Sequence, residues 1–273
     1  LLYAGRTHSI HGESESGKSW VAQAECARLV RLGFHVKYVD FESDAGTVAG
    51  RLVRLGATAA QVREYFHYSA PIVKPGADQL EYAAWSRMFT GRFALVVIDG
   101  VTDALGLWGL KTADNDDYTT FSRAFPRRLA TETGAAVLLV DHVTKSTENR
   151  GRFAVGGQAK MNSLSGAAYV VDVVEPMGIG IRGVLSLGLA KDRGGYLRGK
   201  AGKFDRNRVQ PIAEFVLDGT GEHLMVAVNP PPALEEERTD ERTTKIISYV
   251  QQYPGQSQSV IARETGIRPA DVI

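Results

Sequence analysis

Residues 12–19 read Gly12-Glu13-Ser14-Glu15-Ser16-Gly17-Lys18-Ser19 and fit the pattern G-x-x-x-x-G-K-[ST]. A short apolar run precedes them and a helix-like run follows, which is the context that a phosphate-binding loop requires. The two glycines let the backbone approach phosphates closely, so that its N–H groups and the next helix start face the anion. Lys18 brings positive charge to the β- and γ-phosphates, and the Ser19 hydroxyl is a ligand for Mg²⁺. We therefore predict a nucleotide-binding site with ATP and Mg²⁺ as its cofactors.

The composition is that of a globular protein. With 273 residues, 44% of them hydrophobic and 23% charged, the chain suits one large α/β domain and a smaller unit. No apolar run approaches the roughly 18–20 residues of a membrane span, so we expect no membrane partner and a cytoplasmic location in a bacterium or phage-infected host. The 32 Lys and Arg against 31 Asp and Glu argue neither for nor against nucleic acid.

Two further features of the composition carry expectations. The single cysteine, Cys26, excludes an internal disulfide and a cysteine-based zinc site, and we expect it to be a small buried residue. The chain starts on Leu1 without a methionine or a signal peptide, so we expect it to be a piece of a longer protein.

Short apolar runs alternate with longer amphipathic segments, which predicts a mostly parallel sheet flanked by helices. The runs Phe93–Ile98 and Ala135–Val140 are continuously apolar, as is typical of strands covered on both faces. From Tyr169 onward the segments are β-rich, which predicts strands that extend the sheet, partly as hairpins. We expect the other strands at 6–11, 35–41, 65–69, 169–174, 184–190, 212–217 and 223–228, and helices at 17–32, 44–55, 78–89 and 115–133.

A change of composition near residue 230 indicates a domain boundary. Pro230–Pro232 are followed by a charge cluster that runs to Arg242, as in an interdomain linker. We predict an ATPase domain over residues 1–229, a linker over 230–243, and the truncated start of a winged helix-turn-helix over 244–273. A short helical hairpin that serves only for packing is the alternative.

Acidic residues follow two of the predicted strands. Asp99 ends a buried strand and is the expected Mg²⁺ ligand, but Gly100 follows it where many such ATPases carry the catalytic base. Parallel strands bring their carboxyl ends to one edge of a sheet, so the acids after the second strand are the nearest substitute. We predict Glu42 as the base that activates the attacking water. We expect Asp44 to be a helix N-cap and Asp40 to be solvated.

His142 follows the strand that ends at Val140, which we place two strands from the phosphate loop. A polar donor at this position would contact the γ-phosphate and report its presence to the loop that follows. A structural histidine is the alternative.

Together these motifs resemble those of RecA-type phosphate-loop ATPases. Within that group they are similar to the RepA-like and DnaB-like hexameric helicases, AAA-family ATPases of phages and plasmids. The segment Leu189–Gly195 resembles the K-x-R segment of these helicases and adds to the resemblance. The other residues that carry it are 12–19, Glu42, Asp99, His142 and Lys145.

The resemblance implies a RecA-like α/β fold in which Lys191 and Arg193 reach the ATP of a neighbouring subunit. Arg193 would be the arginine finger. A guanidinium against the γ-phosphate is worth roughly 10³–10⁵ in rate, and supplying it from a neighbour makes hydrolysis depend on assembly. The alternative is a β-hairpin with two solvated cations.

Residues 146–165 are glycine-rich and basic, and a stretch this long without evident structure is usually functional or disordered. In RecA-type proteins the loop after the sensor faces a central channel and grips single-stranded DNA. By resemblance, Arg150, Arg152 and Lys160 would contact phosphates, and Phe153 would stack on bases. A mobile surface loop with solvated charges is the alternative.

The resemblance thus implies Mg²⁺-dependent ATP hydrolysis between subunits of a homo-oligomeric ring, expected to be a hexamer, coupled to binding or movement along single-stranded DNA. A recombination, repair or regulatory ATPase that does not unwind DNA is the first alternative. A small-molecule kinase is the second. A pure DNA-binding module leaves the nucleotide motifs without a role.

Overall fold

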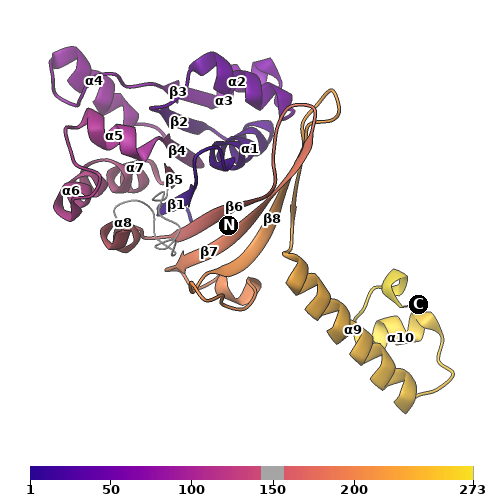
Figure 1. The fold of residues 1–273 in the computed structure, drawn as a ribbon. Coiled ribbons are helices and arrows are strands. Elements are labelled where there is room, and N and C mark those ends of the chain that lie inside the picture. Colours follow the sequence, from indigo (N-terminus) through magenta and orange to yellow (C-terminus); the bar gives the residue numbers. More distant parts are fainter. Residues whose placement is uncertain (143–156, 273) are drawn as a thin grey trace. The chain divides into compact units, whose positions relative to one another are not determined.

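One mixed sheet organises the larger part of the chain. The computed structural model describes residues 1–142 and 157–272, and in this part nine strands form a sheet in the order β3-β2-β4-β5-β1-β6-β7-β8-β9. The strands from β3 to β6 pair in parallel, and β6 to β9 pair antiparallel (Figure 1). This confirms the prediction of a mostly parallel sheet that hairpins extend.

The strands occupy the expected parts of the sequence, with shifts of a few residues at their ends. Their bounds are β1 Thr7–Gly12, β2 Val36–Asp40, β3 Phe66–Ser69, β4 Leu95–Asp99, β5 Ala136–His142, β6 Ala167–Glu175, β7 Arg182–Asp192, β8 Gln210–Asp218 and β9 Met225–Asn229.

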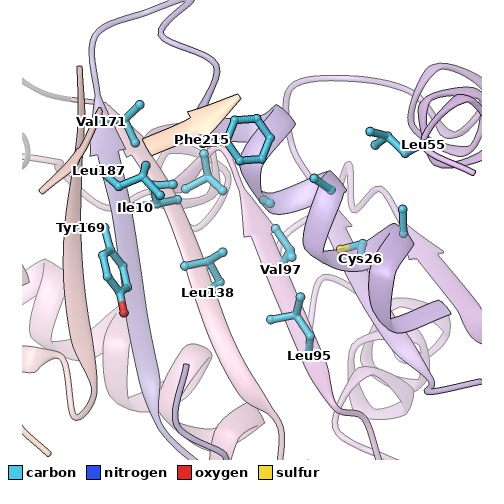
Figure 2. Packing of buried hydrophobic residues seen from close by; sticks show 14 of the residues in the cluster. Ile10, Cys26, Leu55, Leu95, Val97, Leu138, Tyr169, Val171, Leu187 and Phe215 are labelled. Carbon is cyan, nitrogen blue, oxygen red and sulfur yellow. The ribbon is translucent and has the colours of Figure 1, made fainter. Parts of the chain in front are cut away.

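Helices cover both faces of the parallel part, as Figure 1 shows. Alternate residues of β4 face opposite sides: Leu95 and Val97 pack with α1 and α2, whereas Val96 and Ile98 pack with α4 to α8. Cys26 on α1 is fully buried above the sheet, as predicted (Figure 2). The helices are α1 Lys18–Arg31, α2 Ala45–Arg54, α3 Ala59–Tyr65, α4 Gln79–Met88, α5 Val101–Leu107, α6 Asn115–Ala124, α7 Pro126–Thr133 and α8 Gly157–Ser163.

Four helical segments differ from the sequence-based expectation. The single helix expected over 115–133 is two helices, because Pro126 has no N–H to continue the first and instead starts the second. The short helices α3 and α5 lie in segments to which we assigned no helix or strand. Helix α8 lies inside the stretch 146–165, where we expected no regular structure.

Residues Pro230–Ile273 form a second compact unit, which is separate from Leu1–Asn229. Helix α9 spans Pro232–Gln252 and so occupies most of the stretch predicted as a linker over 230–243; a proline in the first turn starts a helix well. Helix α10, Gln258–Thr265, and a 3₁₀ turn at Pro269–Asp271 follow. Ile261, Ala262, Ile267 and Val272 form a small core. The helix-turn-helix remains a prediction.

Among residues 1–142 and 157–272, no helix combines the length and the apolar character that a membrane crossing needs.

His8 on β1 is fully buried. The Ala167 N–H lies 3.0 Å from its Nδ1, and both the N–H (2.9 Å) and the carbonyl oxygen (3.1 Å) of Tyr3 lie within hydrogen-bond distance of its Nε2. A Cβ on Gly166 would lie 2.3 Å from the ring, so glycine is needed there. Burial lowers the pKa of His8 from 6.5 to about 4, which keeps the imidazole neutral in the folded protein.

The lowered pKa of His8 predicts that the folded protein loses stability in acid. Because unfolded His8 takes up a proton near pH 6.5 and folded His8 only near pH 4, its contribution to stability is complete above pH 6.5 and is lost as the pH falls to about 4. The expected loss is up to about 3 kcal/mol in the free energy of unfolding. Denaturant titrations across this range should show a flatter pH dependence for His8→Gln. His223→Gln, at an exposed position, is the control, and an unchanged slope for His8→Gln would refute the assignment.

Candidate nucleotide site

The carboxyl ends of four parallel strands bring the predicted site residues together. Asp40 at the end of β2 is in register with Asp99 at the end of β4, and Gly12 at the end of β1 is in register with His142 at the end of β5. Strand β5 pairs directly with β1, so His142 lies one strand closer to the phosphate loop than we expected. The loop, both predicted acids and the predicted sensor therefore share one edge of the sheet.

The phosphate loop joins β1 to α1 and depends on both of its glycines. A Cβ on Gly12 would lie 2.6 Å from the Val171 carbonyl oxygen. Gly17 has φ +80° and is the N-cap of α1, and a Cβ there would lie 2.2 Å from Met177. No side chain caps α1 and no acidic residue lies in its first turn, so the helix start can accept an anion.

Lys18 is buried at the start of α1, with 4% of its surface exposed. Its ammonium donates to the Glu13 carbonyl and, at 3.3 Å, to the Ser16 hydroxyl. Burial lowers the pKa of Lys18, and the carboxylates of Glu42, Asp99 and Asp141 oppose that shift. The positive charge of Lys18 thus interacts with three carboxylates at this edge of the sheet.

Glu42 and His142 meet across the site. The Glu42 Oε1 lies 3.2 Å from the His142 Nε2, and both side chains are about one-third exposed. Gly100 makes room for this contact, because it has φ +89° and a Cβ there would lie 2.8 Å from the Glu42 Cγ. Gly100, the residue after Asp99, therefore packs directly against the side chain of Glu42.

Asp40 is almost fully buried, so the expectation of a solvated side chain was wrong. One carboxylate oxygen accepts the backbone N–H groups of Glu42 and Ser43, each at 2.9 Å, and the other accepts the Tyr68 hydroxyl at 3.0 Å. Asp40 thereby fixes the turn that carries Glu42. Asp44 is the N-cap of α2, as predicted, and accepts the Thr47 N–H at 2.9 Å.

Asp99 is buried with one oxygen unsatisfied. Its Oδ2 accepts the Tyr38 hydroxyl, whereas Oδ1 has no hydrogen-bond partner within the described residues. Burial raises the pKa of Asp99 to about 6; the Tyr38 and Ser19 hydroxyls act in the opposite direction, and the Glu42 and Asp40 carboxylates add to the rise. A free carboxylate oxygen beside a serine hydroxyl is the ligand chemistry that Mg²⁺ prefers, so these residues fit the predicted metal.

Residues 1–148 match the family described as AAA domain, and this match covers more than half of the chain. The chain belongs to the AAA domain family. The matched region contains the phosphate loop, Glu42, Asp99 and His142. Family membership supports nucleotide binding and ATPase-type activity, as the sequence predicted, while the RepA-like and DnaB-like branch remains a prediction. No curated protein matches the sequence.

Two lysines that we expected to contact DNA or a neighbouring subunit instead bond to groups of their own chain in this AAA protein. The Lys160 ammonium is 2.6 Å from Asp141, and each of the two side chains is 4% exposed, so Lys160 is not presented to solvent for a DNA phosphate. The Lys191 ammonium donates to the carbonyls of Met161 and, at 2.9 Å, Leu164 at the end of α8. Burial, with help from the charges of Arg193 and Arg127, lowers the pKa of Lys191 to about 8.

Arg193 lies at the edge of the sheet opposite to the phosphate loop. The end of β7 pairs with the start of β6, where Ala167 is in register with Asp192, and the Arg193 N–H donates to the Gly166 carbonyl at 3.1 Å. Its side chain is exposed. Arg193 is therefore remote from the nucleotide site of its own chain. Lys145, Arg150, Arg152 and Phe153 lie outside the described residues.

Because Gly100 packs against Glu42, adding a methyl group at position 100 should disturb the proposed catalytic base. Gly100→Ala forces a left-handed backbone, at a cost of roughly 1–2 kcal/mol, and displaces the Glu42 carboxylate. We expect the kcat of ATP hydrolysis to fall by about 10²-fold while ATP affinity stays within a few-fold. Gly106→Ala on α5 is the control, because no atom lies within 4 Å of the added Cβ. Equal kcat values for the two variants would contradict this role of Gly100.

Proposed function

We propose that this AAA domain hydrolyses Mg²⁺-ATP at the interface between two copies of the chain, with Glu42 as the catalytic base. The observation that carries the proposal is the contact of Glu42 with His142 over Gly100, at the same sheet edge as Lys18 and Asp99. A base, a γ-phosphate sensor, a phosphate-binding cation and a metal ligand are thereby within reach of one nucleotide.

Each group has a separate chemical task in this proposal. The loop N–H groups and the start of α1 bind the phosphates, and the Lys18 ammonium exchanges the Glu13 carbonyl for phosphate oxygens. Glu42 orients the attacking water and takes its proton. His142 contacts the γ-phosphate, so the contact between His142 and Glu42 differs before and after hydrolysis. Ser19 and Asp99 would hold Mg²⁺, which neutralises charge on the phosphate oxygens when bound.

The position of Arg193 favours an interface. Because the side chain is exposed at the opposite edge of the sheet, the nucleotide that it can reach belongs to a neighbouring copy. A head-to-tail arrangement of this kind closes into a ring when its rotation allows. We propose a homo-oligomeric ring, with Arg193 as the arginine finger. Lys191 instead supports α8 within its own chain.

We further propose that hydrolysis is coupled to single-stranded DNA, as in a RepA-like helicase. Arg150, Arg152 and Phe153 belong to the stretch that joins His142 to α8. The Asp141–Lys160 ion pair joins the residue before His142 to α8, the elements on either side of this stretch. Lys160 would then act as an anchor of the DNA-contacting stretch. A regulatory or recombination ATPase shares these features but would not separate strands.

Replacing the proposed base should separate binding from turnover. Glu42→Gln keeps the shape but cannot take a proton, so we expect near-normal ATP affinity and a fall in kcat of about 10²–10⁴-fold. Glu132→Gln on α7 is the matched control, because that carboxylate pairs with Arg128 at the surface. Steady-state ATPase assays and equilibrium binding of a fluorescent ATP analogue measure the two quantities. Normal turnover by Glu42→Gln would move the base elsewhere.

Mixing two inactive variants tests the shared site. Arg193→Ala and Lys18→Ala should each lose most activity, yet a mixture should regain part of it. Its mixed interfaces pair an intact Arg193 with an intact phosphate loop. The assay is run with and without single-stranded DNA, on oligomers confirmed by light scattering. Mixed oligomers without recovery would exclude action between copies, and ATPase rates indifferent to DNA would exclude the coupling.

A further inference from the structure

A directional chain of hydrogen bonds ends on Asp99. The Arg51 guanidinium donates to the Gln23 Oε1 at 3.3 Å, and the Gln23 Nε2 donates to the Tyr38 hydroxyl oxygen at 3.1 Å. The Tyr38 hydroxyl in turn donates to the Asp99 Oδ2. Gln23, Tyr38 and Asp99 are all buried, and the Arg51 guanidinium lies 4.5 Å from the Trp20 ring centre.

The chemistry of the donors fixes the direction of every step. A guanidinium can only donate, so it faces the amide oxygen of Gln23 and turns the amide nitrogen toward Tyr38. Because that nitrogen also only donates, it occupies the hydroxyl oxygen of Tyr38 as an acceptor. The single hydroxyl proton of Tyr38 is then left for Asp99.

The consequence is that the two oxygens of Asp99 are not equivalent. Tyr38 occupies Oδ2, while Oδ1 is buried and has no hydrogen-bond partner in the described residues. The Ser19 hydroxyl interacts with the Asp99 carboxylate and lowers its pKa, against the effect of burial. The two predicted metal ligands, Ser19 and Asp99, are therefore neighbours.

We propose that Tyr38, held by Gln23 and Arg51, is a positioning residue that orients Asp99 so that Oδ1 alone is available to the divalent cation. The inference rests on the proposed function, because it assigns the Mg²⁺ of that function to Ser19 and Asp99. Hydrogen bonds to ligating carboxylates fix their orientation, and removing such a bond typically costs 10–100-fold in metal affinity.

The test measures binding of a fluorescent ATP analogue as Mg²⁺ is titrated. Tyr38→Phe removes only the hydroxyl, so we expect the half-saturating Mg²⁺ concentration to rise about 10–100-fold, while affinity for the analogue without Mg²⁺ is unchanged. Tyr68→Phe is the matched control, since it removes a hydroxyl from the neighbouring carboxylate of Asp40 in a ring stacked beside Tyr38. Its Mg²⁺ titration should follow wild type.

Gln23→Met provides a second variant that leaves Tyr38 in place. Without the incoming N–H, the hydroxyl is less constrained, so the Mg²⁺ half-saturation should rise in the same direction and by less. Weaker analogue binding in the absence of Mg²⁺, or equal shifts for Tyr38→Phe and Tyr68→Phe, would show a general structural role and overturn the proposal. Wild-type protein that fails to bind the analogue would overturn the proposed function itself, which is a separate outcome.

Discussion

Negative charge concentrated at one sheet edge is the constraint on which this site depends. Asp40, Glu42, Asp99 and Asp141 come from three strand ends, and three of the four act on the charge of the buried Lys18. Carboxylates in a poorly solvated edge repel one another, so each needs a donor, a cation or a proton. The fold supplies hydrogen-bond donors and cations to some of these carboxylates and not to others. This difference separates the structural acids from the proposed reactive ones.

Asp40 and Asp141 are the satisfied pair. Asp40 accepts two backbone N–H groups and a tyrosine hydroxyl, and Asp141 has the ammonium of Lys160. Both act as fixed parts of the framework, one under the turn of Glu42 and the other between β5 and α8. Asp99 and Glu42 retain unused acceptor capacity, which is what a metal ion and a reacting water require. The proposed function thus assigns the chemistry at this edge to the acids that the fold leaves incompletely paired.

Local sequence signals predicted much of this arrangement. The phosphate loop has a fixed spacing, and the continuous apolar runs before Asp99 and His142 are typical of strands covered on both faces, which they are. Because parallel strands end at a common edge, Glu42 could be placed near the phosphates before its contacts were known. The α9 start was missed because a proline run beside charged residues has the composition of a linker as well as of a helix start.

The roles of Asp40, Lys160 and Tyr38 depend on partners distant in the chain. Tyr68 is 28 residues from Asp40, Asp141 is 19 from Lys160, and Asp99 is 61 from Tyr38. No local pattern distinguishes a buried, paired aspartate or lysine from a solvated one, since the difference is made by tertiary contacts. Polar residues in a glycine-rich or acidic segment were therefore expected at the surface.

Two cations lie at the end of β7: Lys191 is inside the strand and Arg193 directly follows it. Lys191 is bonded to the carbonyl end of α8, and Arg193, two residues on, is exposed at the molecular edge. In the proposed ring, the arginine that reaches the nucleotide of the next copy would lie two residues along the backbone from the lysine that is hydrogen-bonded to the end of α8. Such a linkage would connect the nucleotide of one copy to helix α8 of its neighbour.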